Sequence, residues 1–101
     1  MGQPSVQIKS VQVGLFPEYD RADMLVVLHI ELTAESDGQQ TLTLQIPADA
    51  NSLGIFKRSE NENPIPLDFE VSEIGKWQDV QFAIDGRNIQ VEYYDPNLVK
   101  E

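Results

Sequence analysis

The segment Met24-Leu25-Val26-Val27-Leu28-His29-Ile30-Glu31-Leu32 decides the fold class of this chain. Its even-numbered residues are all apolar, whereas its odd-numbered residues change from Leu25 and Val27 to polar types. Alternate residues of a β-strand face opposite sides, so the pattern predicts a central strand that is covered on both faces at its start and on one face at its end. A helix is disfavoured because no 3.6-residue apolar stripe appears and because Val and Ile favour strands.

Working outward toward the N-terminus, two short alternations precede this segment. The first includes Ile8, and the second contains Val11, Val13 and Leu15. Because strand side chains repeat every two residues, the step of three between Ile8 and Val11 moves the apolar set to the opposite face. The sequence therefore predicts a β-bulge or kink near Lys9-Ser10, in a strand at the edge of a sheet.

Toward the C-terminus, further alternations follow at regular spacing. We expect strands near residues 42–46, 53–56, 65–71, 77–84 and 89–93. Asp37-Gly38 predicts the turn that ends the central strand region. Pro66 places its strand at a sheet edge, because proline cannot donate a hydrogen bond to a neighbouring strand.

The register of the next hairpin follows from parity, since directly opposed residues of antiparallel strands share a face. A two-residue turn at Gly75-Lys76 pairs Val71 with Val80 and agrees with both apolar sets. The same register pairs Ile74 with Trp77 on the outer face.

A last hairpin is predicted around Asp85-Gly86. A two-residue turn there and a four-residue loop over residues 85–88 both keep the apolar residues on one side. The two-residue turn opposes Asp79 to Glu92, a like-charge pair that destabilises unless a cation lies between the carboxylates. We therefore favour the four-residue loop.

Together these strands predict an all-β domain. Seven or eight strands, with turn signals every eight to twelve residues, indicate an antiparallel two-sheet β-sandwich of immunoglobulin-like type. The 101 residues with 41% hydrophobic content fit one such domain over residues 1–101. The end at residues 97–101 permits a fragment of a longer chain.

Charge and composition exclude several functional classes. The chain has 7 Lys and Arg against 17 Asp and Glu, which gives a net charge of −10 and a surface that repels nucleic acid. We expect no membrane insertion by this segment, because no apolar run approaches the roughly 18 residues that a spanning helix needs. The absence of cysteine excludes disulfides and thiolate chemistry.

We expect no catalytic residues. Nucleophilic catalysis needs a nucleophile beside an oriented base, and the chain has one histidine and serines in turns or at strand ends. His29 lies in the middle of the central strand. We interpret it as a structural histidine bonded to a neighbour.

Two acidic turns are candidates for a metal site. Glu18 and Asp20 precede the central strand, while Glu92 and Asp95 lie near the end of the chain. Calcium prefers six to eight oxygen ligands, so these residues would bind Ca²⁺ if the fold brought the two turns together, although their spacing matches no EF-hand. The alternative, which we favour, is a polar cluster of the two turns that only latches the sandwich.

Exposed aromatic residues are candidates for a ligand or partner surface. Parity places Trp77, Ile74 and Tyr94 on outer faces and turns Tyr93 inward. Flat aromatic side chains stack on sugar rings, and exposed apolar patches mark partner surfaces. Packing of Trp77 over Ile74 at a sheet end is the competing interpretation, and we favour it.

Two motifs carry a family resemblance. Leu15-Phe16-Pro17-Glu18-Tyr19-Asp20-Arg21 with Met24-Leu25-Val26-Val27, and later Glu92-Tyr93-Tyr94-Asp95-Pro96, resemble a β-sandwich domain of bacterial extracytoplasmic or membrane-anchored proteins of unknown function, with the pattern (L/I)WPEYDRPxVLV … EYYDP. Phe16 replaces its Trp and Ala22 its second Pro. The resemblance implies an immunoglobulin-like or carboxypeptidase-regulatory-like architecture at the cell surface, and no activity or binding residues.

The expected function is that of a non-catalytic accessory or protein-interaction module. A protein partner or a neighbouring domain would bind at exposed edge strands. The main alternative is a carbohydrate-binding module that uses Trp77 and Tyr94, and a further alternative is a calcium-stabilised surface domain.

Overall fold

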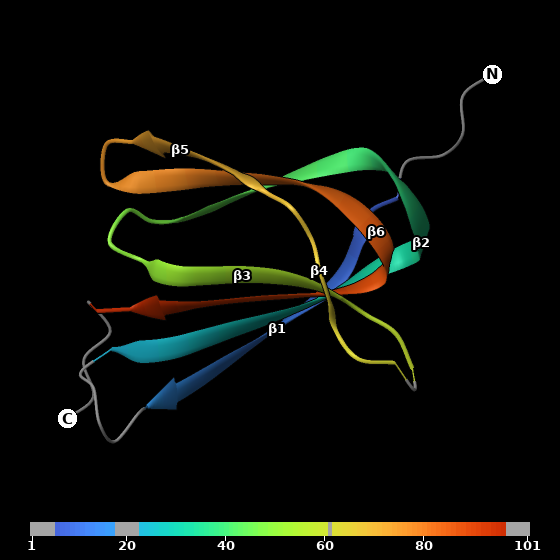
Figure 1. The fold of residues 1–101 in the computed structure, drawn as a ribbon, viewed down its shortest axis with the longest axis horizontal. Helices are drawn as coiled ribbons and strands as arrows, with labels where there is room; N and C mark the ends of the chain where they lie inside the picture. The colour runs from blue at the N-terminus through green and yellow to red at the C-terminus, as the bar shows by residue number, and fades with distance from the viewer. Residues whose placement is uncertain (1–5, 18–22, 61, 97–101) are drawn as a thin grey trace.

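The computed structural model describes residues 6–17, 23–60 and 62–96. These residues form an antiparallel β-sheet of six strands and contain no helix (Figure 1). The strands are β1 (Ile8–Pro17), β2 (Met24–Pro47), β3 (Asn51–Arg58), β4 (Ile65–Pro66), β5 (Glu70–Ile74) and β6 (Trp77–Asp95). The all-β class predicted from the sequence is confirmed.

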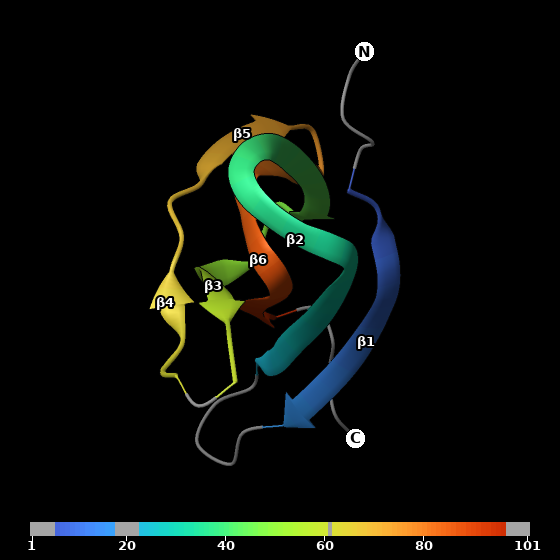
Figure 2. The same ribbon diagram turned by 90° about the vertical axis from the view of Figure 1, so that its right-hand side faces the viewer.

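The long strands β2 and β6 organise the sheet, because they pair with each other twice. The first half of β2 pairs with the end of β6, from Met24 opposite Asp95 onward, and the second half of β2 pairs with the start of β6, as far as Pro47 opposite Trp77. Between the halves both strands bend, and Figure 2 shows β2 curling back over itself. The order of strands is β1-β2-β6-β3-β4, and β5 pairs with the start of β6.

The bend replaces two turns that the sequence predicts. Asp37-Gly38 and Asp85-Gly86 were each expected to reverse the chain, but both lie inside continuous strands, where Asp37 opposes Asp85. Gly38 and Gly86 have positive φ angles of 88° and 84°, which allow an irregularity in a strand as readily as a turn. Because the two segments oppose each other, both strands bend together. The bend therefore joins four predicted strands into two, β2 and β6.

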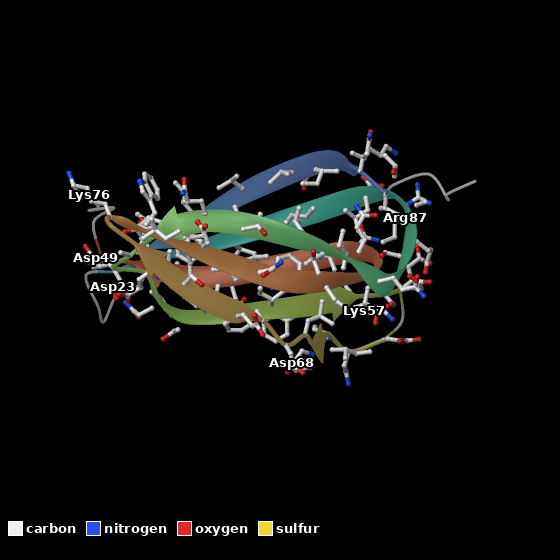
Figure 3. The ribbon with its side chains drawn as sticks, turned by 90° about the horizontal axis from the view of Figure 1, so that it is seen from above. Asp23, Asp49, Lys57, Asp68, Lys76 and Arg87 are labelled. Atoms are coloured by element: carbon white, nitrogen blue, oxygen red, sulfur yellow. The ribbon has the colours of Figure 1, made fainter. Side chains whose placement is uncertain are left out.

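Contacts among three strands, β2, β3 and β6, hold the bend. Arg87 donates a hydrogen bond from Nε to the backbone oxygen of Leu32 at 3.3 Å. Lys57 of β3 forms an ion pair with Asp85, with 3.1 Å between Nζ and Oδ1. Figure 3 shows Lys57 and Arg87 at this end of the molecule. The bend is therefore stabilised by contacts made from neighbouring strands as well as by glycine.

Several other sequence predictions are confirmed. The segment that begins at Met24 is central, with β1 on one side and β6 on the other. The register of β1 shifts between Ile8 and Ser10, at the predicted bulge. In the β5–β6 hairpin Val71 opposes Val80 as expected.

The predicted strand over residues 65–71 is divided in two. β4 pairs with β3, whereas β5 pairs with β6, so the chain crosses between the two halves of the sheet within residues 67–69. Pro66 lies in β4 at the end of the strand order, which confirms its predicted edge position. Leu67 still donates its backbone N–H to Ile55 at 2.8 Å before the crossing.

One core cluster draws its residues from both halves of the bent pair. Its buried side chains are Val26, Ile30, Leu32 and Ile46 of β2, Ile55 of β3, and Val80, Phe82, Ile84, Ile89, Val91 and Tyr93 of β6. At the end opposite the bend, buried Gln78 donates from Nε2 to the backbone oxygens of Pro47, Ala48 and Ala50. This amide fixes the turn between β2 and β3 to the start of β6.

Candidate functional site

The first candidate surface is the core-side face of β1, formed by Val11, Val13 and Leu15, which we call the β1 stripe. Val13 opposes Leu28 of β2, and Leu28 in turn opposes Val91 of β6. Directly opposed residues share a face, so Val13 and Val91 point to the same side of the sheet. Yet Val91 is 1% exposed and Val13 is 61% exposed. The row is covered at one end and open at the other.

The other residues of the β1 stripe repeat this contrast. Val11 lies in a row with Ile30 and Ile89, and it is 47% exposed while they are 2% and 0% exposed. Leu15 lies in a row with Val26 and Tyr93, and its exposed fraction is 53%. Three consecutive core-side positions of β1 therefore lack cover from the described part of the chain.

The position of β1 in the sheet explains this exposure. β1 is the first strand of the order, so one of its backbone edges has no partner strand among the described residues. Residues 10–16 carry no charge, and the ion pair between Lys9 and Glu31, at 3.7 Å, lies at one end of the strand. Uncharged edge strands pair readily with other chains.

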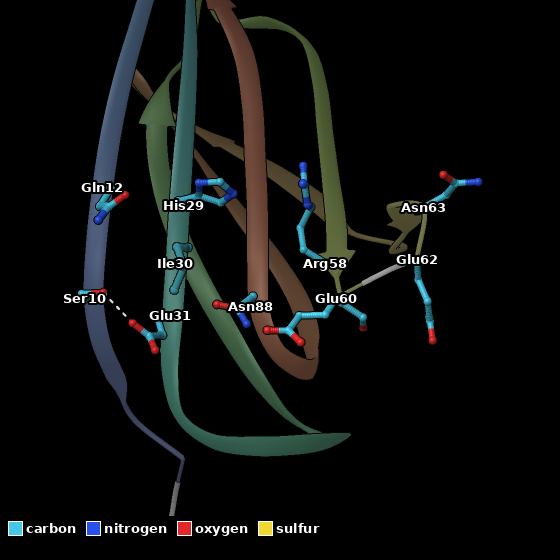
Figure 4. Close-up of a pocket in the computed structure, with 11 residues that line it drawn as sticks. Ser10, Gln12, His29, Ile30, Glu31, Arg58, Glu60, Glu62, Asn63 and Asn88 are labelled. Carbon is cyan, nitrogen blue, oxygen red and sulfur yellow. Dashed lines mark hydrogen bonds between the residues drawn. The ribbon is translucent and has the colours of Figure 1, made fainter.

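The second candidate surface lies on the opposite, outer face of the same strands. An open hollow of about 560 Å³ lies there (Figure 4). Its polar lining includes Ser10 and Gln12 of β1, His29 and Glu31 of β2, Asn88 of β6 and Arg58 of β3. Two cross-strand rows supply these residues, one through Gln12, His29 and Gln90 and one through Ser10, Glu31, Asn88 and Arg58. We call this surface the outer hollow.

Hydrogen bonds order part of the outer hollow. Arg58 donates from Nη1 to Oε1 of Gln90 at 2.7 Å, and Gln90 donates from Nε2 to Oε2 of Glu92 at 3.1 Å. Ser10 donates from Oγ to Oε1 of Glu31 at 3.3 Å. The bond from the Arg58 guanidinium and the bond to the Glu92 carboxylate hold the Gln90 side chain between two charged groups.

His29 does not have the structural bond that the sequence suggested. Its side chain is exposed on the outer face, and no described residue forms a hydrogen bond with it. The same holds, within the described part of the chain, for the side chains of Gln12 and Asn88. Donors and acceptors from three strands thus face the outer hollow without protein partners.

Two phenylalanine rings flank this face, and sequence reasoning did not select them as a pair. Phe16 lies over Gly14, because a Cβ on Gly14 would lie 2.7 Å from Cε2 of Phe16. Phe56 lies over Gly54 in the same way, at 2.9 Å. Gly14 and Gly54 belong to one cross-strand row, through Val27 and Glu92. The repeated pattern Gly-x-Phe in β1 and β3 is the signal that would have indicated these rings.

The predicted aromatic surface is divided between two faces. Ile74 and Trp77 oppose each other in the β5–β6 hairpin and are 57% and 47% exposed. Tyr94 opposes Leu25 and Asn51 in the other half of the sheet, where it is half-buried. Because Trp77 begins β6 and Tyr94 lies near its end, on the two sides of the bend, they do not form one continuous platform.

The predicted metal ligands are also distributed. Glu18 and Asp20 lie outside the described residues. Glu92 and Asp95 differ in parity along β6, and Asp95 is buried while Glu92 lies on the outer face beside Gln90. Within the described ranges no three His, Cys, Asp or Glu side chains gather in a way that could hold a metal ion.

The described flanks of the two acidic turns nevertheless meet. Pro17 opposes Met24, and Met24 opposes Asp95, so the described flanks of both acidic turns lie in one row. Tyr93 points into the core as predicted, at 8% exposed. Burial, and secondarily the charge of Asp95, raise the pKa of the Tyr93 hydroxyl above its ordinary value.

None of the described segments forms a helix that could cross a membrane. Comparison of the chain with protein-family models, with curated proteins and with solved structures gave no match.

Proposed function

We propose that this chain is a non-catalytic protein-interaction module that binds an extended segment of a partner protein along β1. The observation that carries the proposal is the exposure of the β1 stripe, in rows whose other members are core residues. The immunoglobulin-like two-sheet architecture and the cell-surface setting implied by the sequence resemblance belong to the same proposal. The proposal also includes a structural latch between the two acidic turns, in place of a calcium site.

The energetics favour a partner that pairs with the backbone of β1. Completing the burial of three half-exposed Val and Leu side chains contributes roughly 2–5 kcal/mol, at about half of the 1.5–3 kcal/mol for each full burial. Association costs about 4–15 kcal/mol in lost freedom, so apolar contact alone is too weak. Hydrogen bonds along the open edge of β1 would supply the remainder, as in strand addition.

Charge selects the kind of partner. The chain carries a net charge of −10, so a second copy approaches against repulsion, whereas a basic segment is attracted and a neutral segment is not repelled. The segment that best fits β1 alternates apolar residues, placed beside the β1 stripe, with lysine or polar residues on the outer side.

A peptide titration tests this proposal. The probe is a ten-residue peptide that alternates valine and lysine, followed by amide chemical shifts of the full chain, with a valine–glutamate peptide as the charge control. We expect saturable shifts centred on residues 10–16 of β1 with the basic peptide. Val13→Lys should abolish them, because it places a charge in the middle of the β1 stripe.

Gln12→Lys is the matched control, since it adds the same charge to the outer face of the same strand and should preserve binding. Equal binding by Val13→Lys, or absence of β1 shifts at millimolar peptide, overturns the proposal. A wild-type dimer that Val13→Lys disperses, without peptide binding, would identify a second copy as the occupant and would also overturn it.

A further inference from the structure

We propose that the outer face of β1, β2, β6 and β3 is a binding site for a neutral oligosaccharide, bound in the outer hollow and against the ring of Phe16. This site is independent of the proposed peptide contact, because it lies on the opposite face of β1. It also differs from the aromatic surface predicted around Trp77.

The polar part of the site suits hydroxyl groups. Each sugar hydroxyl both donates and accepts hydrogen bonds, and the amides of Gln12 and Asn88 offer both functions. His29 lies between them in the lining and adds one donor and one acceptor when neutral. These three side chains have no hydrogen-bond partner among the described residues, so a ligand need not break a protein contact to bind them.

The apolar part of the site is the ring of Phe16, which lies outside the lining of the hollow, further along β1. Phe16 is 52% exposed and lies over Gly14, two residues along β1 from Gln12. Phe56 lies over Gly54 at the other end of the same row, three strand spacings away, or about 14 Å. Rings laid against the sheet leave a face free for a sugar ring to stack upon, and the distance accommodates more than one sugar unit.

Charge argues for a neutral ligand. The lining contains Glu31, Glu60 and Glu62 against one arginine, Arg58, which already donates to Gln90. An acidic lining repels phosphates, sulfates and uronic acids. The volume of about 560 Å³ falls in the range of about 300–1,000 Å³ that is usual for small-molecule sites.

The test is a panel of neutral hexasaccharides of glucose, mannose, galactose or xylose, with sulfated and uronic-acid oligosaccharides beside them, measured by calorimetry on the full chain. We expect at least one neutral probe to bind. Phe16→Ala and Gln12→Ala should each weaken its affinity by about tenfold or more, as loss of a central contact does. Both residues are exposed, so the variants should remain folded.

Three further variants decide between explanations. Trp77→Ala, a matched loss of an exposed aromatic on the other half of the sheet, should leave affinity unchanged. Gly14→Ala keeps the Phe16 ring but displaces it, because the new Cβ would lie 2.7 Å from the ring, and should weaken binding. Val13→Lys should leave glycan binding intact, so this proposal and the peptide proposal fail separately.

The outcomes that overturn the site are distinct. They are loss of binding in Trp77→Ala with retention in Phe16→Ala, binding of anionic probes alone, and no binding of any probe at millimolar concentration.

Discussion

β1 and β6 flank the same half of β2 and carry the same alternation of apolar residues, but these residues are exposed in β1 and buried in β6. Ile89 and Val91 of β6 are 0% and 1% exposed, whereas Val11 and Val13, which oppose the same two residues of β2, are about half exposed or more. The difference arises because β6 bends and brings its own first half over the core. β1 has no such continuation within the part of the chain that the structure describes.

The comparison teaches that alternation specifies which side of a sheet a residue faces and leaves open what covers that side. Cover is a property of the neighbours, and here it is supplied by residues far away in the sequence. A strand that reads as half-buried can therefore be a binding surface, which is how we interpret β1.

The largest expected effect comes from the same substitution at the two ends of one row. Val91→Ala should lower the free energy of unfolding by about 1–3 kcal/mol, because it removes two methyl groups from a packed core. Val13→Ala, across Leu28 from it, should cost less than about 0.5 kcal/mol, as exposed substitutions do. Urea unfolding of both variants measures the difference. Equal costs would mean that β1 is covered in solution by a part of the chain that the structure does not describe.

A second prediction concerns the bend within β2 and β6. Gly86→Ala should destabilise by about 1–3 kcal/mol, since φ is +84° and a Cβ would lie 3.1 Å from the stem of Lys57. Gly38→Ala is the matched control, because Gly38 has φ +88° with nothing within 4 Å of its Cβ position. Chemical denaturation of the two variants isolates the crowding at Lys57. A larger cost at Gly38 would contradict the assignment of Gly86 as the tighter of the two glycines.

The smallest expected effect concerns the row of Leu15, Val26 and Tyr93, in which Leu15 is exposed and Tyr93 is buried. The folded state raises the pKa of Tyr93 above its unfolded value of about 10. The contribution of this pKa difference to the free energy of unfolding is therefore fully present below pH 10. It is lost as the pH rises from there through the raised pKa of the folded state. The difference in unfolding free energy between wild type and Tyr93→Phe should shrink above pH 10, as urea titrations from pH 8 to 11 would reveal. Parallel pH curves for the two proteins would sink this assignment.

Local patterns predicted much of the fold. The central position of the segment from Met24, the bulge beside Lys9, the inward direction of Tyr93 and the register of Val71 with Val80 all follow from period-two alternation. The bend in β2 and β6 does not follow from this alternation. An Asp-Gly pair permits positive φ, but whether it ends a strand or bends it depends on the strand opposite, and Asp37 and Asp85 oppose each other only in the folded chain.

The sequence predicted less of the candidate surfaces than of the fold. Edge strands were expected as partner sites, but nothing local shows that Val13 lacks cover. Trp77 and Tyr94 were grouped because both point outward, but they pair with different halves of the sheet. The outer hollow draws residues from four strands, so its composition depends on a strand order that parity alone does not determine.

The double pairing of β2 with β6 has a consequence for how the chain reaches its folded state. Met24 meets Asp95, so the central pair closes most of the chain into a loop, and even its nearest partners, Pro47 and Trp77, enclose three other strands. The β5–β6 hairpin is local and can form early, whereas the central ladder must wait for this costly closure. Such non-local topologies fold in milliseconds to seconds, and during that interval the uncharged residues 10–16 of β1 have neither β2 nor a partner beside them.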